Sequence, residues 1–147
     1  IIRVLPPMTA SASSEASVSG NEGGAEFLID GNIETYWHSK WSSPAAELPH
    51  WAQVDLGVEY YVNQVEMWRR GSTNNDIKTC ILQLSTDGIT WDDIETYEFS
   101  EATDKYRSTT LDVPRRARYV RYYVTESNRP PYAGIAEIKI DKTPIFE

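Results

Sequence analysis

The chain has 147 residues, a hydrophobic fraction of 40% and a charged fraction of 24%, which fit one globular domain and exclude a disordered chain. Its net charge of −8 argues against nucleic acid or an anionic membrane as the main partner. No segment reaches the ~20 apolar residues of a membrane helix, and no signal peptide is visible. Because the chain begins with Ile1 and not with methionine, we expect residues 1–147 to be a single domain of a longer protein.

The predicted elements are almost all strands. An edge strand is expected in the Ser- and Ala-rich residues 9–19, followed by one helical turn over residues 25–29. Alternation of apolar and polar residues then predicts strands in residues 52–56, 64–68, 80–85, 120–124 and 137–140. Turn signals lie at residues 55–57, 71–75, 86–88 and 130–131. Short strands at this spacing predict an all-β sandwich or barrel.

The sequence lacks the familiar catalytic signatures. It contains no nucleophile elbow, P-loop, HExxH motif or CxxC pair. The single cysteine, Cys80, excludes an intramolecular disulfide and is expected to be a buried, inert thiol. Asp92 with Asp93, or Glu98 with Glu101, could be imagined as glycosidase carboxylates, but charged residues in polar turns are the better interpretation. We therefore predict that the chain is not an enzyme.

The segment over residues 27–39 is the most distinctive. Its Asp-Gly-Asn triplet at residues 30–32 interrupts strand character, and Asp30 and Thr35 supply a carboxylate and a hydroxyl within one tight loop. Hard cations such as Ca²⁺ take about six to eight oxygen ligands, so one interpretation is a cation site. The other is a turn held by side-chain hydrogen bonds to the backbone, and the spacing alone favours it.

His38, Trp41 and Arg70, with Asn74 and Asn75, make a candidate sugar site. An aromatic face stacks on the apolar face of a pyranose, while His, Arg and Asn side chains hydrogen-bond its hydroxyls. Each residue also has a structural explanation, as a satisfied histidine, a loop anchor or a solvated strand end. Spacing does not decide between the two interpretations.

An ordered series of segments resembles a known family. The series includes Ala-Ser-Ala-Ser-Ser (10–14), Leu-Ile-Asp-Gly-Asn (28–32), Trp-His-Ser (37–39), Trp-Ala-Gln-Val-Asp-Leu-Gly (51–57), Trp-Arg-Arg (68–70), Ser-Thr-Asp-Gly (85–88), Ala-Arg-Tyr-Val-Arg (117–121) and Ala-Glu-Ile (136–138). It covers nearly the whole chain and resembles the discoidin, or coagulation factor 5/8 type C, domains, and within them the bacterial family 32 carbohydrate-binding modules. The resemblance implies an eight-stranded, discoidin-like (galactose-binding-domain-like) jelly-roll β-sandwich with both termini at one end.

The resemblance also implies a structural Ca²⁺ site. Its ligands would be backbone or side-chain oxygens of Phe27, Asp30, Asn32, Thr35, Ala136 and Glu137. Because Glu137 is far from Asp30 in the sequence, such an ion would join the two ends of the chain and add stability.

For the sugar site, the resemblance implies contacts from His38, Trp41, Arg70 and Asn75, with Glu22 or Tyr132 from neighbouring loops. The family often has proline before its arginine, where this chain has Arg69, so either Arg69 or Arg70 could face the ligand. The glycine that commonly follows the asparagine is Asp76 here, which leaves the Asn75 contact open.

Two functions follow from the resemblance. The first is a non-catalytic module of a bacterial extracellular or cell-surface protein, which binds galactose-type or related glycans and carries a structural calcium ion. The alternative is a protein-interaction or adhesion domain without a sugar ligand, because fold does not determine function. A small concave pocket would favour the first, and a flat aromatic patch the second. The terminal disulfide and an obvious set of membrane-inserting loop hydrophobics are missing, which disfavours phospholipid binding.

Overall fold

The computed structural model describes residues 4–70, 76–99 and 105–146, which form strands and one short 3-10 helix. The elements are β1 (Thr9–Ala12), β2 (Glu22–Gly23), the 3-10 helix η1 (Ala25–Ile29), β3 (Tyr36–His38), β4 (His50–Arg69), β5 (Ile77–Ser85), β6 (Asp92–Glu98), β7 (Tyr106–Ser127) and β8 (Gly134–Pro144). The predicted all-β class is confirmed. Among these residues, no helix has the length and apolar character needed to cross a membrane.

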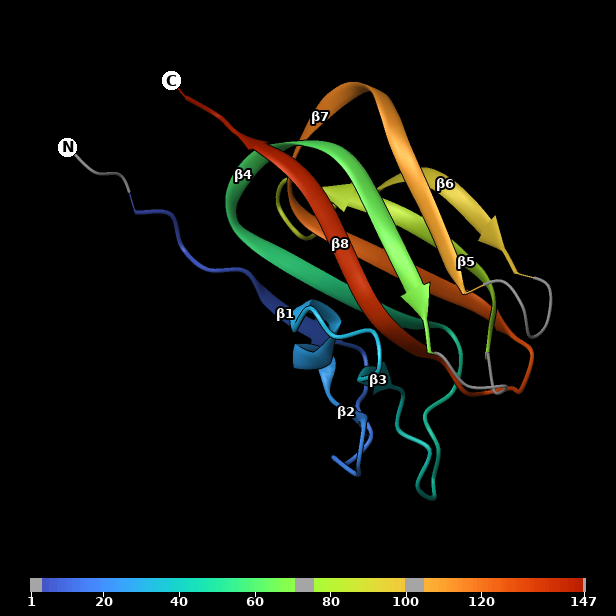
Figure 1. Cartoon of the computed structure of the whole chain (residues 1–147). Helices are drawn as coiled ribbons and strands as arrows, with labels where there is room; N and C mark the ends of the chain where they lie inside the picture. The colour runs from blue at the N-terminus through green and yellow to red at the C-terminus, as the bar shows by residue number, and fades with distance from the viewer. Residues whose placement is uncertain (1–3, 71–75, 100–104, 147) are drawn as a thin grey trace.

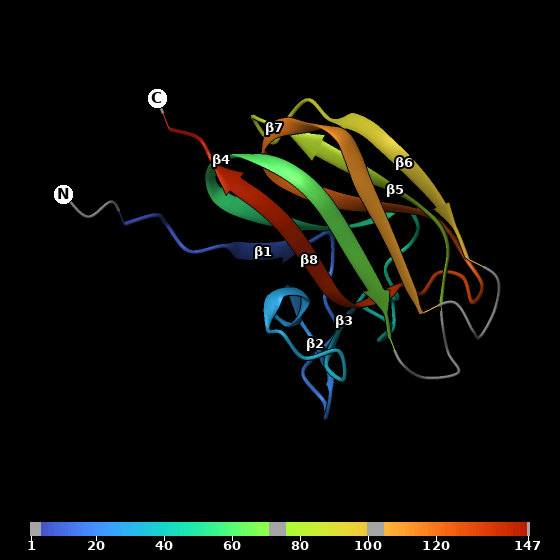
Figure 2. The same cartoon turned by 45° about the horizontal axis from the view of Figure 1, so that its top comes forward.

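Two long strands build the sandwich. β4 has 20 residues and β7 has 22, and both bend near their middle (Figure 1). The first half of β4 pairs with β1 and with the second half of β7. The second half of β7 also pairs with β5, and β5 pairs with β6. The second half of β4 pairs with β8 and with the first half of β7. The eight described strands are therefore hydrogen-bonded into one folded sheet whose two halves face each other (Figures 1 and 2).

Apolar side chains from both halves fill the space between them. Val54 and Leu56 from the first half of β4, and Val65 and Met67 from its second half, are fully buried in one cluster. The alternation predicted for these segments is thus the alternation between core and solvent. Cys80 lies in the same cluster, and burial raises the pKa of its thiol, as expected for an inert cysteine.

One expectation from the sequence was wrong. Asp92, Asp93 and Glu98 lie on the strand β6 and not in polar turns, while Glu101 lies outside the described residues. Among the described strands, β6 pairs only with β5, and an edge strand that is mostly exposed needs little apolar alternation. No strand was predicted at β3, because its three residues are too few to show a period.

The bend of β4 depends on Gly57. Its φ of +91° lies in the region that only glycine occupies without strain, and a Cβ there would stand 2.9 Å from the Cβ of Pro6. We expect Gly57→Ala to lower the free energy of unfolding by about 2 kcal/mol. Urea denaturation would measure the loss. Gly20→Ala is the matched control, since Gly20 also has a positive φ but nothing lies within 4 Å of its Cβ position. Equal losses in both variants would mean that the contact with Pro6 is unimportant.

The two ends of the described chain lie together at one end of the sandwich (Figure 1). β2, β3, the end of β4 and the start of β8 lie toward the opposite end. The end that contains β2 and β3 carries the candidate functional site.

Candidate functional site

A hollow of about 260 Å³ lies where β2, β3, the end of β4 and the segment before β8 meet. Its lining consists of Glu22, His38, Trp41, Arg70, Arg129 and Tyr132. Five of these six residues were predicted from the sequence, in segments up to 110 residues apart (132 − 22). Asn74 and Asn75 lie outside the described residues.

Short strand pairings place the lining residues. Glu22 on β2 is the register partner of Tyr36 on β3, and His38 on β3 is the partner of Gly134 on β8. A Cβ on Gly134 would stand 3.2 Å from the carbonyl oxygen of Trp37 and 3.4 Å from the side chains of His38 and Arg70. The absence of a side chain at Gly134 therefore lets the backbone of β3 approach β8 closely beside these two residues.

Asp76 is the electrostatic centre beneath the hollow. Its carboxylate is fully buried and accepts hydrogen bonds from Arg129, at 2.7 Å from Nε and 3.4 Å from Nη2. The Nε2 atom of His38 lies 3.3 Å from the same carboxylate, and Nη1 of Arg70 lies 3.8 Å from it. Burial alone would raise the pKa of Asp76, but hydrogen bonds from His38 and Arg129 outweigh it and leave the pKa below its ordinary value.

His38 lies at the base of the hollow and is only 2% exposed. Its Nδ1 atom is 2.7 Å from the backbone carbonyl oxygen of Ser39, while Nε2 faces Asp76. Both ring nitrogens therefore already have oxygen partners. The imidazole edge is held in one orientation, and its ring also packs against Tyr132 at a centroid distance of 5.8 Å.

The structure separates the two adjacent arginines. Arg70 lines the hollow and stacks on the ring of Tyr36, 4.4 Å from its centroid. Arg69 is 2% exposed; it stacks on Phe99 and donates a hydrogen bond from Nη1 to the carbonyl oxygen of Ile77. Consecutive residues at a strand end point to opposite faces. Of the two, Arg70 is thus the arginine on the side of the hollow.

Trp41 forms the exposed wall and is held by Glu22. Its indole Nε1 donates a 2.6 Å hydrogen bond to Oε2 of Glu22, whose other oxygen accepts a bond from the hydroxyl of Tyr36 at 3.3 Å. Half of the Trp41 surface remains exposed. The carboxylate of Glu22 therefore anchors the edge of the indole and leaves area on the ring for contact with a ligand.

Sequence reasoning missed Asp76 and Arg129 as members of the site. Arg129 stacks on Tyr132 at 5.2 Å and its carboxylate partner lies 53 residues earlier in the chain. Asp76 was noticed only as a departure from a family pattern. A charged residue four positions before the predicted strand at residues 80–85 was the one available signal, and nothing local indicated its partners.

A second group of polar residues lies between η1 and β8. It consists of the loop over residues 30–35, called here the Asp30 loop, and of Glu137 on β8. The Asp30 carboxylate accepts bonds from the amide of Asn32 at 3.0 Å and from the hydroxyl of Thr35, and that hydroxyl also lies 3.0 Å from the carbonyl oxygen of Asn32. The amide of Gly31 donates to Glu137 at 3.1 Å. Phe27 lies in η1 and Ala136 in β8, directly before Glu137.

The carboxylate of Asp30 in this loop faces the carboxylate of Glu137 on β8. Glu137 is 3% exposed, and burial together with a hydrogen bond and repulsion from Asp30 raises the pKa of Glu137 to about 7. Two acids held this closely need either a shared proton or a cation. Carboxylate, hydroxyl and carbonyl oxygens are the donors that Ca²⁺ takes, so the residues present fit such an ion.

Comparison with known proteins places the chain in a family. The family profile of the F5/8 type C domain matches residues 9–138. A Clostridium perfringens domain, CpGH89CBM32-5, solved in complex with GalNAc-β-1,3-galactose, is 30% identical with a TM-score of 0.80, covering 90% of this chain and 94% of that one. The family 32 module of Clostridium perfringens NanJ, in complex with galactose, is 29% identical with a TM-score of 0.76, covering 90% and 92%.

Among curated proteins, a sialidase of Micromonospora viridifaciens is 31% identical over 124 residues, which are 82% of this chain. The chain spans only 19% of the length of that sialidase. The profile match over most of the chain and the structural agreement lead to one conclusion: the chain belongs to the F5/8 type C (discoidin) domain family, and its structural neighbours are family 32 carbohydrate-binding modules.

Proposed function

We propose that this domain is a non-catalytic carbohydrate-binding module that takes a galactose-type sugar in the hollow between Trp41 and Arg70. The observation that carries the proposal is the convergence, in one small concavity, of an exposed indole face with guanidinium groups and a tyrosine from separate loops. The two structural neighbours described above, solved with GalNAc-β-1,3-galactose and with galactose, support the same class of ligand.

The chemistry of the hollow suits a neutral sugar. Glu22 and Asp76 offset the charges of Arg70 and Arg129, so the hollow has no large excess of either sign among its described residues. Nε of Arg70 is buried without a hydrogen-bond partner among those residues, which is the kind of donor that a ligand oxygen or a water satisfies. The concave shape favours a small ligand over the flat contact of a protein partner.

The arrangement gives little support to catalysis. Hydrolysis of a glycoside needs two carboxyl groups that flank the scissile bond. Glu22 holds Trp41 and Tyr36, and Asp76 lies fully buried under its cationic partners, so neither acid is presented as a free group. We propose that the domain serves to tether a longer extracellular or cell-surface bacterial protein to glycans. The separate Asp30 loop would hold Ca²⁺ for stability and would not touch the sugar.

Trp41→Ala is expected to weaken binding of galactose or N-acetylgalactosamine at least tenfold, because the mutation removes the stacking face, which is worth about 1.4 kcal/mol or more. NMR titration of the isolated domain would measure the dissociation constants, which are expected in the micromolar to millimolar range. Phe146→Ala is the matched control, since this exposed aromatic belongs to the C-terminal end of the described chain, which lies at the opposite end of the sandwich (Figure 1). Unchanged affinity in Trp41→Ala, with sugar binding intact, would place the site elsewhere.

A further inference from the structure

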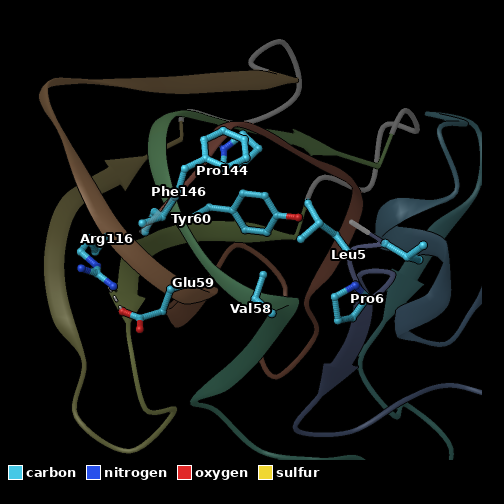
Figure 3. Close-up of a pocket in the computed structure, with 10 residues that line it drawn as sticks. Leu5, Pro6, Val58, Glu59, Tyr60, Arg116, Pro144 and Phe146 are labelled. Carbon is cyan, nitrogen blue, oxygen red and sulfur yellow. Dashed lines mark ion pairs between the residues drawn. The ribbon is translucent and has the colours of Figure 1, made fainter. Parts of the chain in front are cut away.

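A second and larger hollow, of about 400 Å³, lies at the end of the sandwich away from the sugar site (Figure 3). It is lined by residues 4–6, by residues 58–60 at the bend of β4, by Arg116 of β7 and by residues 144–146. In Figure 3, the side chains of Pro144 and Phe146 and those of Leu5 and Val58 surround the ring of Tyr60. Both ends of the described chain thus contribute walls to one cavity, which we call the terminal hollow.

The terminal hollow is apolar and has few groups that could orient a small polar ligand. Its charged residues, Glu59 and Arg116, pair with each other at 3.6 Å (Figure 3). The rest of the lining is aliphatic, aromatic or proline. Val4 is 85% exposed and Phe146 is 79% exposed, which is costly for large apolar side chains that line one hollow. A concentration of such side chains on a domain surface is typical of an interface with another protein unit.

The lengths of the curated relatives bear on which protein unit would cover the terminal hollow. The chain spans 19% of the sialidase and 19% of the galactose oxidase that it matches, so in those proteins the matching segment is one part of a longer polypeptide. Any further domain of the same polypeptide would be tethered at one of the chain ends, directly beside the terminal hollow. Such a tether gives the neighbouring domain a high effective concentration at the terminal hollow. Even a weak apolar contact between the two domains would then be formed most of the time.

We propose that the terminal hollow is a docking surface for an apolar face of an adjoining domain of the same polypeptide. β8 runs from Gly134, at the sugar hollow, to Pro144, at the terminal hollow. Its 11 residues span roughly 30 Å in an extended strand. A docked neighbour would therefore lie against the far end of the domain and leave the Trp41 hollow open to glycans. The contact would hold the sugar-binding end at a fixed orientation relative to the rest of the protein.

Hydroxyl-radical footprinting of the 147-residue chain and of the full-length polypeptide that contains it would test this proposal. We expect labelling of Phe146 to fall at least threefold in the full-length protein, because the docked domain covers the ring. Trp41 is the internal control: it is 51% exposed at the other end and should be labelled equally in both. Equal labelling of Phe146 in both proteins would overturn the proposal, and so would a gene that encodes no further folded domain.

A charged substitution checks that the contact is apolar. Val4→Glu in the full-length protein should restore Phe146 labelling to the level of the isolated domain, because a carboxylate cannot be buried in an apolar contact without a large cost. Val18→Glu is the matched control, since Val18 is also exposed but lies in the segment before β2. In the isolated domain, both variants should keep the wild-type melting temperature to within about 2 °C. Persistent protection of Phe146 in Val4→Glu would contradict docking at the terminal hollow.

Discussion

Asp76→Ala is expected to abolish measurable sugar binding and to lower the free energy of unfolding by about 3–5 kcal/mol. The carboxylate is fully buried, and its removal would leave His38, Arg70 and Arg129 facing each other without a counter-charge. Repulsion between the guanidinium groups of Arg70 and Arg129 should then push the two arginines apart and open the hollow. Urea denaturation measures the stability, and NMR titration with galactose measures the binding.

Asp76→Asn separates the two contributions. The amide preserves shape and one acceptor oxygen but removes the charge, so we expect a smaller loss of stability and a partial loss of affinity. Glu22→Gln is a comparison at the exposed side of the same hollow and should cost less than about 1 kcal/mol in stability. If Asp76→Ala were as stable as Glu22→Gln, the carboxylate would not be the centre that organises the site.

The lowered pKa of Asp76 also predicts the direction of the pH dependence. A carboxyl whose pKa is lower in the folded state stabilises the fold above its unfolded-state pKa, which is ordinarily 3.8, and this contribution is lost as the pH falls through the folded-state pKa. The difference in stability between the wild type and Asp76→Asn should therefore be constant near neutral pH and shrink below about pH 4.

Calcium is expected to raise the melting temperature of the isolated domain by about 10 °C when it is present at about a hundredfold excess over its dissociation constant, because such binding adds about 2.7 kcal/mol. The predicted ligands Asp30 and Glu137 come from opposite ends of the chain, so the ion would oppose their separation during unfolding. Differential scanning calorimetry with Ca²⁺, and then with excess chelator, measures the shift. A shift of less than 1 °C would argue against a calcium site in this loop.

The raised pKa of Glu137 determines how this shift should vary with pH. In the calcium-free domain, the proton on Glu137 contributes stability that is fully present below the ordinary pKa of 4.5 and is lost as the pH rises through about 7. A cation requires the deprotonated carboxylate and competes with that proton. The calcium-induced shift should therefore be larger at pH 8 than at pH 5. Glu137→Gln should remove most of the shift at both values.

Local patterns in the sequence were enough to predict the all-β class and parts of the four longer strands β4, β5, β7 and β8. Alternation in residues 52–56, 64–68, 80–85, 120–124 and 137–140 corresponds to segments of β4, β5, β7 and β8. Two predicted segments, 52–56 and 64–68, proved to be halves of the single strand β4, because Gly57 permits a bend without ending the strand. Alternation reports which side of a strand is buried, and it carries no information on where a strand changes from one half of the sandwich to the other.

Resemblance to the family added candidate residues that periodicity could not supply. It added Glu22 and Tyr132 to the candidates His38, Trp41 and Arg70, and the folded chain brings all five to one hollow. It did not distinguish Arg69 from Arg70. That difference depends on the pleat at the end of β4, which turns Arg69 toward Phe99 and leaves Arg70 on the side of Tyr36.

The sequence by itself thus determined the strand character, the burial of Cys80 and the candidate residues of a binding site, because these depend on neighbours in the chain or on ordered motifs. Only the tertiary structure decided that Asp76 joins His38, Arg70 and Arg129, that Glu22 holds Trp41, and that both chain ends form one apolar hollow. Apart from the pair of Asp76 with Arg70, these contacts connect residues 19 to more than 100 positions apart. The way the sheet folds over determines which charged residues meet across such separations. That folding depends on the packed core as a whole and not on any local segment.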